Sequence, residues 1–272
     1  MNRRKNHLFA IPYYIWMLFF VIAPILLLVY RSLFDINGHL TLSNYIYFFT
    51  SKNYLIMTLS SFVTALLVTL FTLLFAYPFA YLLTQTKYKS LWILLVILPT
   101  WINLLLKIYA FIGILAKSGP LVSWLEAIGF YHPQLLFTNF AFILVAVYVE
   151  LPFMTLPIYY SIDEISPSIM EASQDLGANS WQRLRRVVFP LSIRGVKSGV
   201  QTVFIPSLSL FMLTRLIGGN RVITLGTAVE QHFLVTQNWG MGASIGVILL
   251  VMMGFIMYLT RERHPQRGHG ND

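Results

Sequence analysis

Apolar residues form long, uninterrupted runs along this chain, and shorter segments between the runs hold most of its charges. A helix that crosses about 30 Å of hydrocarbon needs roughly 20 residues, because each residue adds 1.5 Å. Six runs reach that length, at about residues 8–31, 58–85, 91–116, 137–162, 193–217 and 240–260. We therefore expect an all-α, polytopic membrane protein with six transmembrane helices, forming a single transmembrane domain over residues 1–272.

The composition supports this interpretation. The chain is 57% hydrophobic and only 11% charged, whereas a soluble domain carries about 25% charged residues. The first apolar run is longer than a signal-peptide core and has no small-residue cleavage pattern before Arg31, so we expect it to be retained as a span. The absence of cysteine excludes disulfides, thiolate metal sites and cysteine nucleophiles.

The net charge of +9 is explained by topology. If the N-terminus is cytoplasmic, the inside segments hold 13 of the 19 basic residues. These are Arg3, Arg4, Lys5, Lys87, Lys89, Arg183, Arg185, Arg186, Arg194, Lys197, Arg261, Arg263 and Arg267. The positive-inside rule then predicts that both termini are cytoplasmic. A nucleic-acid partner is not needed to account for the charge.

The segment between the fourth and fifth runs, about residues 163–192, is polar and predicts two short helices. Ser166 and Pro167 suit the N-cap and first position of a helix, and Gly177 suits its end. A second helix can begin at Asn179. The first helix has an apolar stripe of Ile169, Ala172 and Leu176 beside the acidic residues Glu171 and Asp175. The second has a stripe of Trp181, Leu184 and Val188 opposite its arginines.

Two functions suit this helix pair. Trp181 and the arginines Arg183, Arg185 and Arg186 suit contact with anionic lipid headgroups. The acidic residues Glu171 and Asp175, with small residues beside them, instead suit close packing by a cytoplasmic partner protein. The residues alone leave both interpretations open.

The stretch "EASQDLGANSWQRLRRVVFP", residues 171–190, resembles the EAA loop of ABC importer permeases. The spacing from Glu171 through Gly177 to Pro190 matches that pattern, with Ser173 in place of alanine and Phe189 in place of leucine. The resemblance implies a coupling helix that docks in a cleft of an ATP-hydrolysing subunit. The implied coupling residues are Glu171, Ala172, Ser173, Asp175, Gly177 and Pro190.

Further segments, among them "AYPFAYLL", "LPTWINLLLKIYAFIGIL" and "VFIPSLSLFMLTRLIGG", are similar to the permeases of spermidine/putrescine ABC importers. This resemblance, over about residues 8–260, implies the MetI-like permease fold in a bacterial plasma membrane. It implies as partners a second homologous permease subunit in a heterodimer, two cytoplasmic ATP-binding subunits and an extracytoplasmic polyamine-binding protein. Transport of another solute such as ferric iron, and proton-coupled secondary transport, are the alternatives.

The same resemblance implies a chain that is not an enzyme and binds no cofactor, with ATP and magnesium held by the partner ATPase. The residues agree, since there is no P-loop and no nucleophile with a base in any one segment. The six histidines also lack the paired spacing of a metal site. They are His7, His39, His132, His232, His264 and His269.

Glu150 is the one acidic residue in the middle of a predicted span. A carboxylate facing lipid there would cost about 3 kcal/mol, so we expect Glu150 to face the bundle interior. Pro152 and Pro157 each remove a helical hydrogen-bond donor, which frees the carbonyl groups of Tyr148 and Phe153 and predicts a broken helix beside a substrate cavity. The alternative is a structural carboxyl group that is protonated or bonded to Lys107 or a tyrosine.

Aromatic residues complete the predicted substrate pathway. Trp101 and Tyr109 lie eight residues apart in the third run, so on an ideal helix their rings share a broad face that suits an ammonium group or an alkyl chain. In the fifth run, Leu210 and Phe211 stand where polyamine and iron permeases often have an acidic residue and an aromatic one. Thr214 replaces their usual proline. The full predicted pathway set is Glu150, Trp101, Tyr109, Tyr148 and Phe211.

Overall fold

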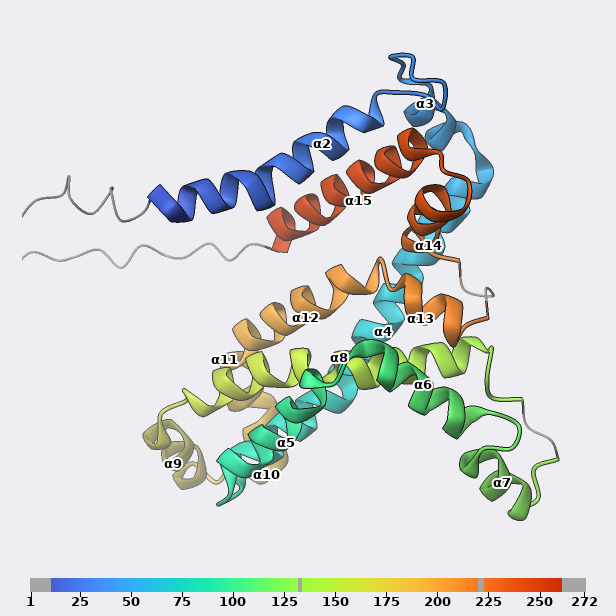
Figure 1. Cartoon of the computed structure of the whole chain (residues 1–272). Helices are drawn as coiled ribbons and strands as arrows, with labels where there is room; N and C mark the ends of the chain where they lie inside the picture. Colours follow the sequence, from blue (N-terminus) through green and yellow to red (C-terminus); the bar gives the residue numbers. More distant parts are fainter. Residues whose placement is uncertain (1–10, 132–133, 220–222, 261–272) are drawn as a thin grey trace, which may run out of the picture.

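The structure is a computed structural model that describes residues 11–131, 134–219 and 223–260 (Figure 1). Within these ranges the chain is helical, and an isolated bridge between Phe34 and Leu40 is its one β-type pairing. In chain order the elements are η1 (Leu18–Ile22), α2 (Ala23–Ser32), α3 (Ser43–Thr50), α4 (Lys52–Gln85), α5 (Lys89–Trp101), α6 (Leu104–Leu115), α7 (Pro120–Ala127), α8 (Asn139–Asp163), α9 (Pro167–Asp175), α10 (Ser180–Arg183), η2 (Leu184–Val188), α11 (Phe189–Leu191), α12 (Ile193–Ser207), α13 (Phe211–Leu216), α14 (Leu225–Glu230), η3 (Gln231–Val235) and α15 (Trp239–Thr260), where η marks a π-helical turn.

Five helical stretches of the described chain are long and apolar enough to cross a membrane. They are Ile11–Ser32, Lys52–Gln85, Leu104–Ala127, Asn139–Asp163 and Trp239–Thr260, and α5 is a shorter apolar helix. Residues 8–10 of the first predicted span lie outside the described residues, as do the terminal basic residues used to predict orientation.

Two segments that hydropathy predicts as continuous helices are divided. In the run 91–116, α5 ends at Trp101, and Asn103 caps α6 by accepting a hydrogen bond from the Leu105 amide at 2.8 Å. In the run 193–217, α12 ends at Ser207 and α13 begins at Phe211. Hydropathy does not register such breaks, because a cap changes backbone direction without changing apolar character.

The break predicted at the α8 prolines is wrong. Helix α8 runs without interruption from Asn139 to Asp163 with Pro152 and Pro157 inside it. Pro152 is buried, and α4 and α12 pack along α8. Neighbouring helices allow a membrane helix to keep its course past a proline.

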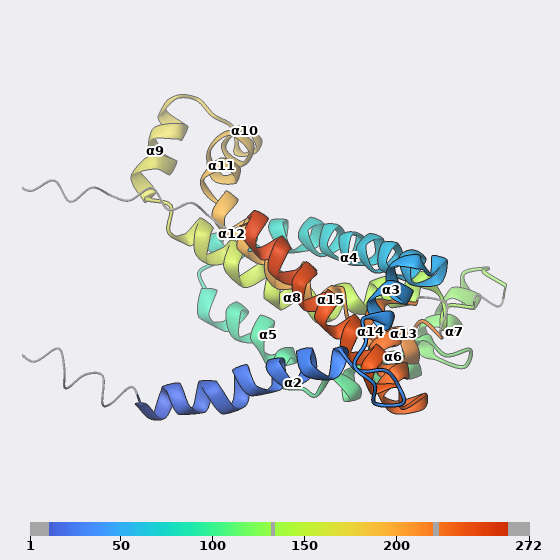
Figure 2. The ribbon, with the colours of Figure 1, turned by 90° about the horizontal axis from the view of Figure 1, so that it is seen from above.

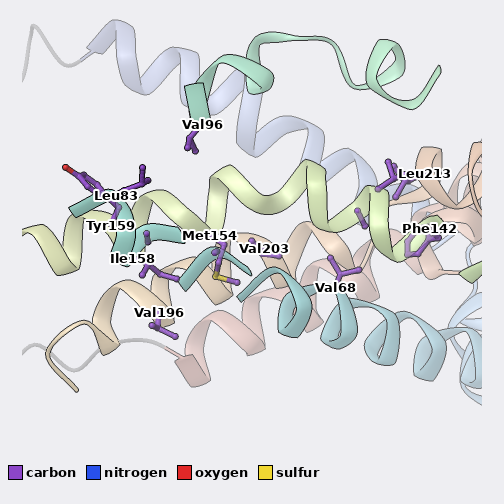
Figure 3. Packing of buried hydrophobic residues seen from close by; sticks show 14 of the residues in the cluster. Val68, Leu83, Val96, Phe142, Met154, Ile158, Tyr159, Val196, Val203 and Leu213 are labelled. Atoms are coloured by element: carbon purple, nitrogen blue, oxygen red, sulfur yellow. The ribbon is translucent and has the colours of Figure 1, made fainter. Parts of the chain in front are cut away.

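The main core lies where α8 packs between α4 and α12. Figure 3 shows Val68 of α4, Met154 of α8 and Val203 of α12 directed into this interior, and all three side chains are fully buried. Two glycines of α12 permit the close approach. A Cβ atom built at Gly195 would lie 2.5 Å from the Pro157 carbonyl oxygen, and one at Gly199 would lie 2.7 Å from the Met154 sulfur.

A second, smaller core joins α15 to α3, α4 and α14 around Phe48, Leu225 and Ile245. Helix α15 also packs along α2, and the Ser244 hydroxyl donates a hydrogen bond to the Ser32 carbonyl oxygen at 3.0 Å. The described end of α15 contacts the main core, because the Gln201 side chain of α12 donates a hydrogen bond to the Thr260 hydroxyl group. The 18-residue window of the span Ile11–Ser32 contains no residue buried within the chain.

The elements sort to two ends of the molecule. In Figures 1 and 2, α9 and α10 lie on the same side as the start of α2 and the end of α15. Helices α3, α7 and α14 lie at the opposite end in both views. The helix pair of residues 163–192 and the described ends of the chain thus share one end.

We expect Gly195→Ala to destabilise the fold, because the added methyl group would overlap the α8 backbone; overpacking of this kind costs about 1–3 kcal/mol. Thermal unfolding of the purified protein in detergent measures the loss. Gly254→Ala is the matched control, since a Cβ atom there meets nothing within 4 Å. Equal melting temperatures for the two variants would contradict the packing argument.

Candidate functional site

Helix α9 forms as the sequence predicts. Ser166 stands at the N-cap and Pro167 is the first helical residue, although the Ser166 hydroxyl bonds to that of Ser168 at 2.8 Å instead of capping the backbone. The helix ends at Asp175, and Gly177 follows with φ of +75°. This left-handed conformation suits glycine, so the stop signal is confirmed.

The predicted apolar stripe of α9 is exposed in the single chain. Leu176 is 89% exposed and Ile169 42% exposed, and Glu171, Ala172 and Asp175 are exposed as well. Ser173 is the exception, because it is buried and its hydroxyl donates a hydrogen bond to the Met170 carbonyl oxygen at 2.7 Å. An exposed apolar stripe beside two carboxylates is a surface suited to a protein partner.

The second helix begins after Asn179, as predicted, with a capping box. The Asn179 side chain accepts a hydrogen bond from the Gln182 amide at 2.8 Å, and the Gln182 side chain accepts one from the Asn179 amide at 3.0 Å. The helix continues through η2 into α11, which contains Pro190. The Phe189 ring lies 5.5 Å from that of Tyr77, so this helix rests against α4.

An ion pair joins the start of α5 to the end of α8. Lys89, the first residue of α5, donates a hydrogen bond to the carboxylate of Asp163, the last residue of α8, at 2.6 Å. Three residues separate Asp163 from Pro167, the first residue of α9. The pair therefore links the start of α5 to the root of the α9 segment.

Glu150 is 5% exposed and is the one buried charged side chain of the described residues. Its predicted orientation towards the interior is confirmed. It makes no hydrogen bond or ion pair within 4.0 Å to a described residue, and Lys107 of α6 is its electrostatic partner. The adjacent Tyr148 packs its ring 4.9 Å from that of Phe111, also on α6.

A cavity of about 180 Å³ lies where α4, α5 and α8 meet, beside the turn that carries Glu150. Its walls include Phe79, Trp92, Val96, Pro99, Tyr148 and Pro152. Of the predicted pathway residues, Tyr148 alone lines this cavity. The single chain therefore contains an aromatic niche at this junction, next to the buried carboxyl group.

The other predicted pathway residues lie apart from this cavity. Trp101 and Tyr109 are 75% and 58% exposed, and they belong to the separate helices α5 and α6. The inference that both rings share one face of a continuous helix is therefore wrong, because the Asn103 cap redirects the chain between them. Phe211 begins α13 and is half-buried.

The opposite end of the molecule holds polar contacts that sequence reasoning did not find. Arg215 of α13 donates a hydrogen bond to Glu230 of α14 at 2.7 Å, beside a cavity of about 370 Å³. His232 shares a hydrogen bond of 2.7 Å with the Tyr54 hydroxyl, and burial lowers the pKa of His232. No regular spacing in the sequence connects these partners.

Within the described residues, no three His, Asp or Glu side chains group in a way that could hold a metal ion. The candidate functional features of the described chain are the exposed α9 surface, the buried Glu150 and the aromatic residues of α5, α6 and α8.

Residues 41–263 match the model of the family described as "Binding-protein-dependent transport system inner membrane component". The chain belongs to this family. Two relatives are the spermidine/putrescine transport system permease proteins PotB of Haemophilus influenzae and Escherichia coli. The first is 33% identical, covering 90% of this chain and 88% of its own, and the second is 32% identical, covering 89% and 91%.

Among solved structures, the fold is similar to a chain of a bacterial alginate ABC transporter in complex with an alginate pentasaccharide-bound periplasmic protein. The TM-score is 0.80 at 19% identity, with 95% of each chain covered. This likeness confirms the expected all-α permease fold. The protein is thus a multi-pass inner-membrane permease, and permeases of this kind are the non-catalytic subunits of ABC importers.

Proposed function

We propose that this permease forms half of a membrane pathway for polyamines such as spermidine and putrescine, with transport driven by ATP hydrolysis in separate subunits. The similarity to PotB proteins over nine-tenths of the chain carries the proposal. Glu150 adds a chemical reason, because it is an acidic group buried without a close ion-pair partner among the described residues. A polyamine ammonium group would supply that partner.

The aromatic residues fit the same cargo. Tyr148 lies beside Glu150 in sequence, and Trp101, Tyr109 and Phe211 have exposed or half-exposed ring surface. Aromatic faces attract ammonium groups and pack against alkyl chains. These rings complete the pathway when a second, homologous permease subunit packs against this one. Because Leu210 stands where related permeases often have an acid, that subunit supplies further carboxylates.

The α9 surface is the proposed contact for one of two ATP-binding subunits, which hold ATP and magnesium. Glu171, Ala172 and Asp175 are exposed there. Gly177 lies in the turn that follows α9, and Pro190 lies in α11, near the end of the second helix. This assignment places α9 and both chain termini in the cytoplasm. An extracytoplasmic polyamine-binding protein then meets the opposite end, where α3, α7 and α14 lie.

The cargo is tested by competition for uptake into vesicles that hold the complete transporter. We expect unlabelled spermidine or putrescine to reduce uptake of labelled spermidine, whereas ferric iron and sulfate leave it unchanged. Uptake should require ATP on the α9 side. Competition by ferric iron alone, or uptake driven by a proton gradient without ATP, would contradict the proposal.

Glu150→Gln should raise the KM for polyamine uptake about tenfold, because the neutral amide loses its attraction to the ammonium group. Initial-rate uptake at several concentrations measures the change. Glu164→Gln, an exposed residue just beyond α8, is the matched control and should retain the native KM. A Glu150→Gln variant with reduced thermal stability and a native KM would assign a structural role to this carboxyl group.

Substitutions of Gly177 should reduce transport-coupled ATP hydrolysis, least for Asn, more for Ala and most for Val. A Cβ atom there meets nothing within 4 Å, so the cost comes from the positive φ alone, about 1–2 kcal/mol for most residues and least for Asn. Gly129→Ala is the control, because Gly129 has φ of +100° and equally open surroundings at the other end of the molecule. Equal loss of coupling in both alanine variants would refute a specific role for the α9 turn.

A further inference from the structure

A groove of about 530 Å³ runs between α4 and the second helix of residues 163–192, called here the coupling segment. This second helix extends from α10 to α11. The residues that line the groove include Leu70, Leu74, Pro78, Trp181, Arg185 and Phe189. Three of these belong to α4 and three lie more than a hundred residues later in the sequence. The contact between the Tyr77 and Phe189 rings holds the two walls together.

The two walls differ in chemistry along the groove. Helix α4, which is long and apolar enough to span the membrane, contributes leucines. Among them, Leu74 is 62% exposed. The other wall adds the Trp181 ring, 68% exposed, and the Arg185 side chain. The apolar part of this groove suits an acyl chain, and the indole and guanidinium groups at its border suit a phospholipid headgroup.

Among the described residues that line the groove, Arg185 is the one with a charged side chain. Arg183, Arg185 and Arg186 lie within four residues of each other, and the sequence has no acidic residue between Asp175 and Glu230. None of the three arginines forms an ion pair with a described residue. The local field therefore favours a negatively charged ligand, worth roughly a fivefold gain in affinity for each basic side chain near a membrane surface.

We propose that this groove binds an anionic glycerophospholipid. The acyl chain lies along Leu70, Leu74 and Phe189, the phosphate meets Arg185, and the Trp181 ring sits at the level of the headgroups. A free phosphate ion would use the guanidinium group but none of the apolar wall, and a neutral lipid would use the wall but not the charge.

The two helices of the coupling segment then meet different partners, an arrangement that rests on the proposed role of α9 but not on the cargo. Helix α9 carries the acidic residues and an exposed apolar stripe for a protein, whereas the α10–α11 helix carries the arginines and leans on α4. The bound lipid anchors the α10–α11 helix to the bilayer surface, so that α9 moves against a fixed neighbour.

The test uses the complete transporter in lipid nanodiscs that contain a photoactivatable phosphatidylglycerol or the matching phosphatidylcholine. We expect phosphatidylglycerol to label the peptides that contain residues 70–78 and 181–189. Arg185→Gln should reduce that labelling about fivefold. Leu74→Trp should also reduce it, by filling the trough. The controls are Arg194→Gln and Leu59→Trp, which are exposed residues outside the groove and should retain native labelling.

Several results would overturn the proposal. Equal labelling by the two lipids would remove the role of charge. Displacement of the label by excess soluble glycerol phosphate would identify a free-anion site. Absence of labelling in the complete transporter, with labelling restored when the ATP-binding subunits are stripped away, would show that a protein covers the groove. Native labelling of both Arg185→Gln and Leu74→Trp would place the lipid elsewhere.

Discussion

The close approach of α12 to α8 is the contact on which the rest of the structure depends. Gly195 and Gly199 remove the side chains that would hold the two backbones apart, and α4 closes the other side of α8. Lipid gives no hydrophobic driving force for helix association, so this dense packing stabilises the bundle by van der Waals contact. It also holds α8 as one continuous helix despite two internal prolines.

This continuous α8 connects the two regions proposed for cargo and for coupling. It carries Glu150 near its middle and Asp163 at its last residue, and α9 begins four residues later. Asp163 is paired with Lys89 at the start of α5, whose other end is Trp101. An exposed ion pair of this kind contributes only about 0.2–1 kcal/mol, so it suits a contact that can break and re-form during a transport cycle.

Sequence alone predicted the membrane class, the all-helical structure, the helix pair after α8 and the burial of Glu150. These features depend on apolar run length, capping residues and the cost of a charge in lipid, all of which are local. It failed where tertiary packing decides. Packing by α4 and α12 keeps α8 whole past Pro152, and the Asn103 cap divides a segment that hydropathy treats as continuous. The Arg215–Glu230 pair depends on how α13 meets α14, for which no sequence signal exists.

This chain leaves large apolar surfaces uncovered, so the proposed cargo pathway needs a second subunit to close it. The window of the first span has no residue buried within the chain, and Trp101 is 75% exposed on a helix that packs on α8 and α4. Lipid can cover the apolar part of such surface at little cost, but it offers no partner for the Glu150 carboxylate or for an ammonium group beside it. A second permease subunit can supply both walls and charge. On the proposed function, this chain fixes the position of one buried carboxyl group and several rings, and a second permease subunit would complete the cargo site.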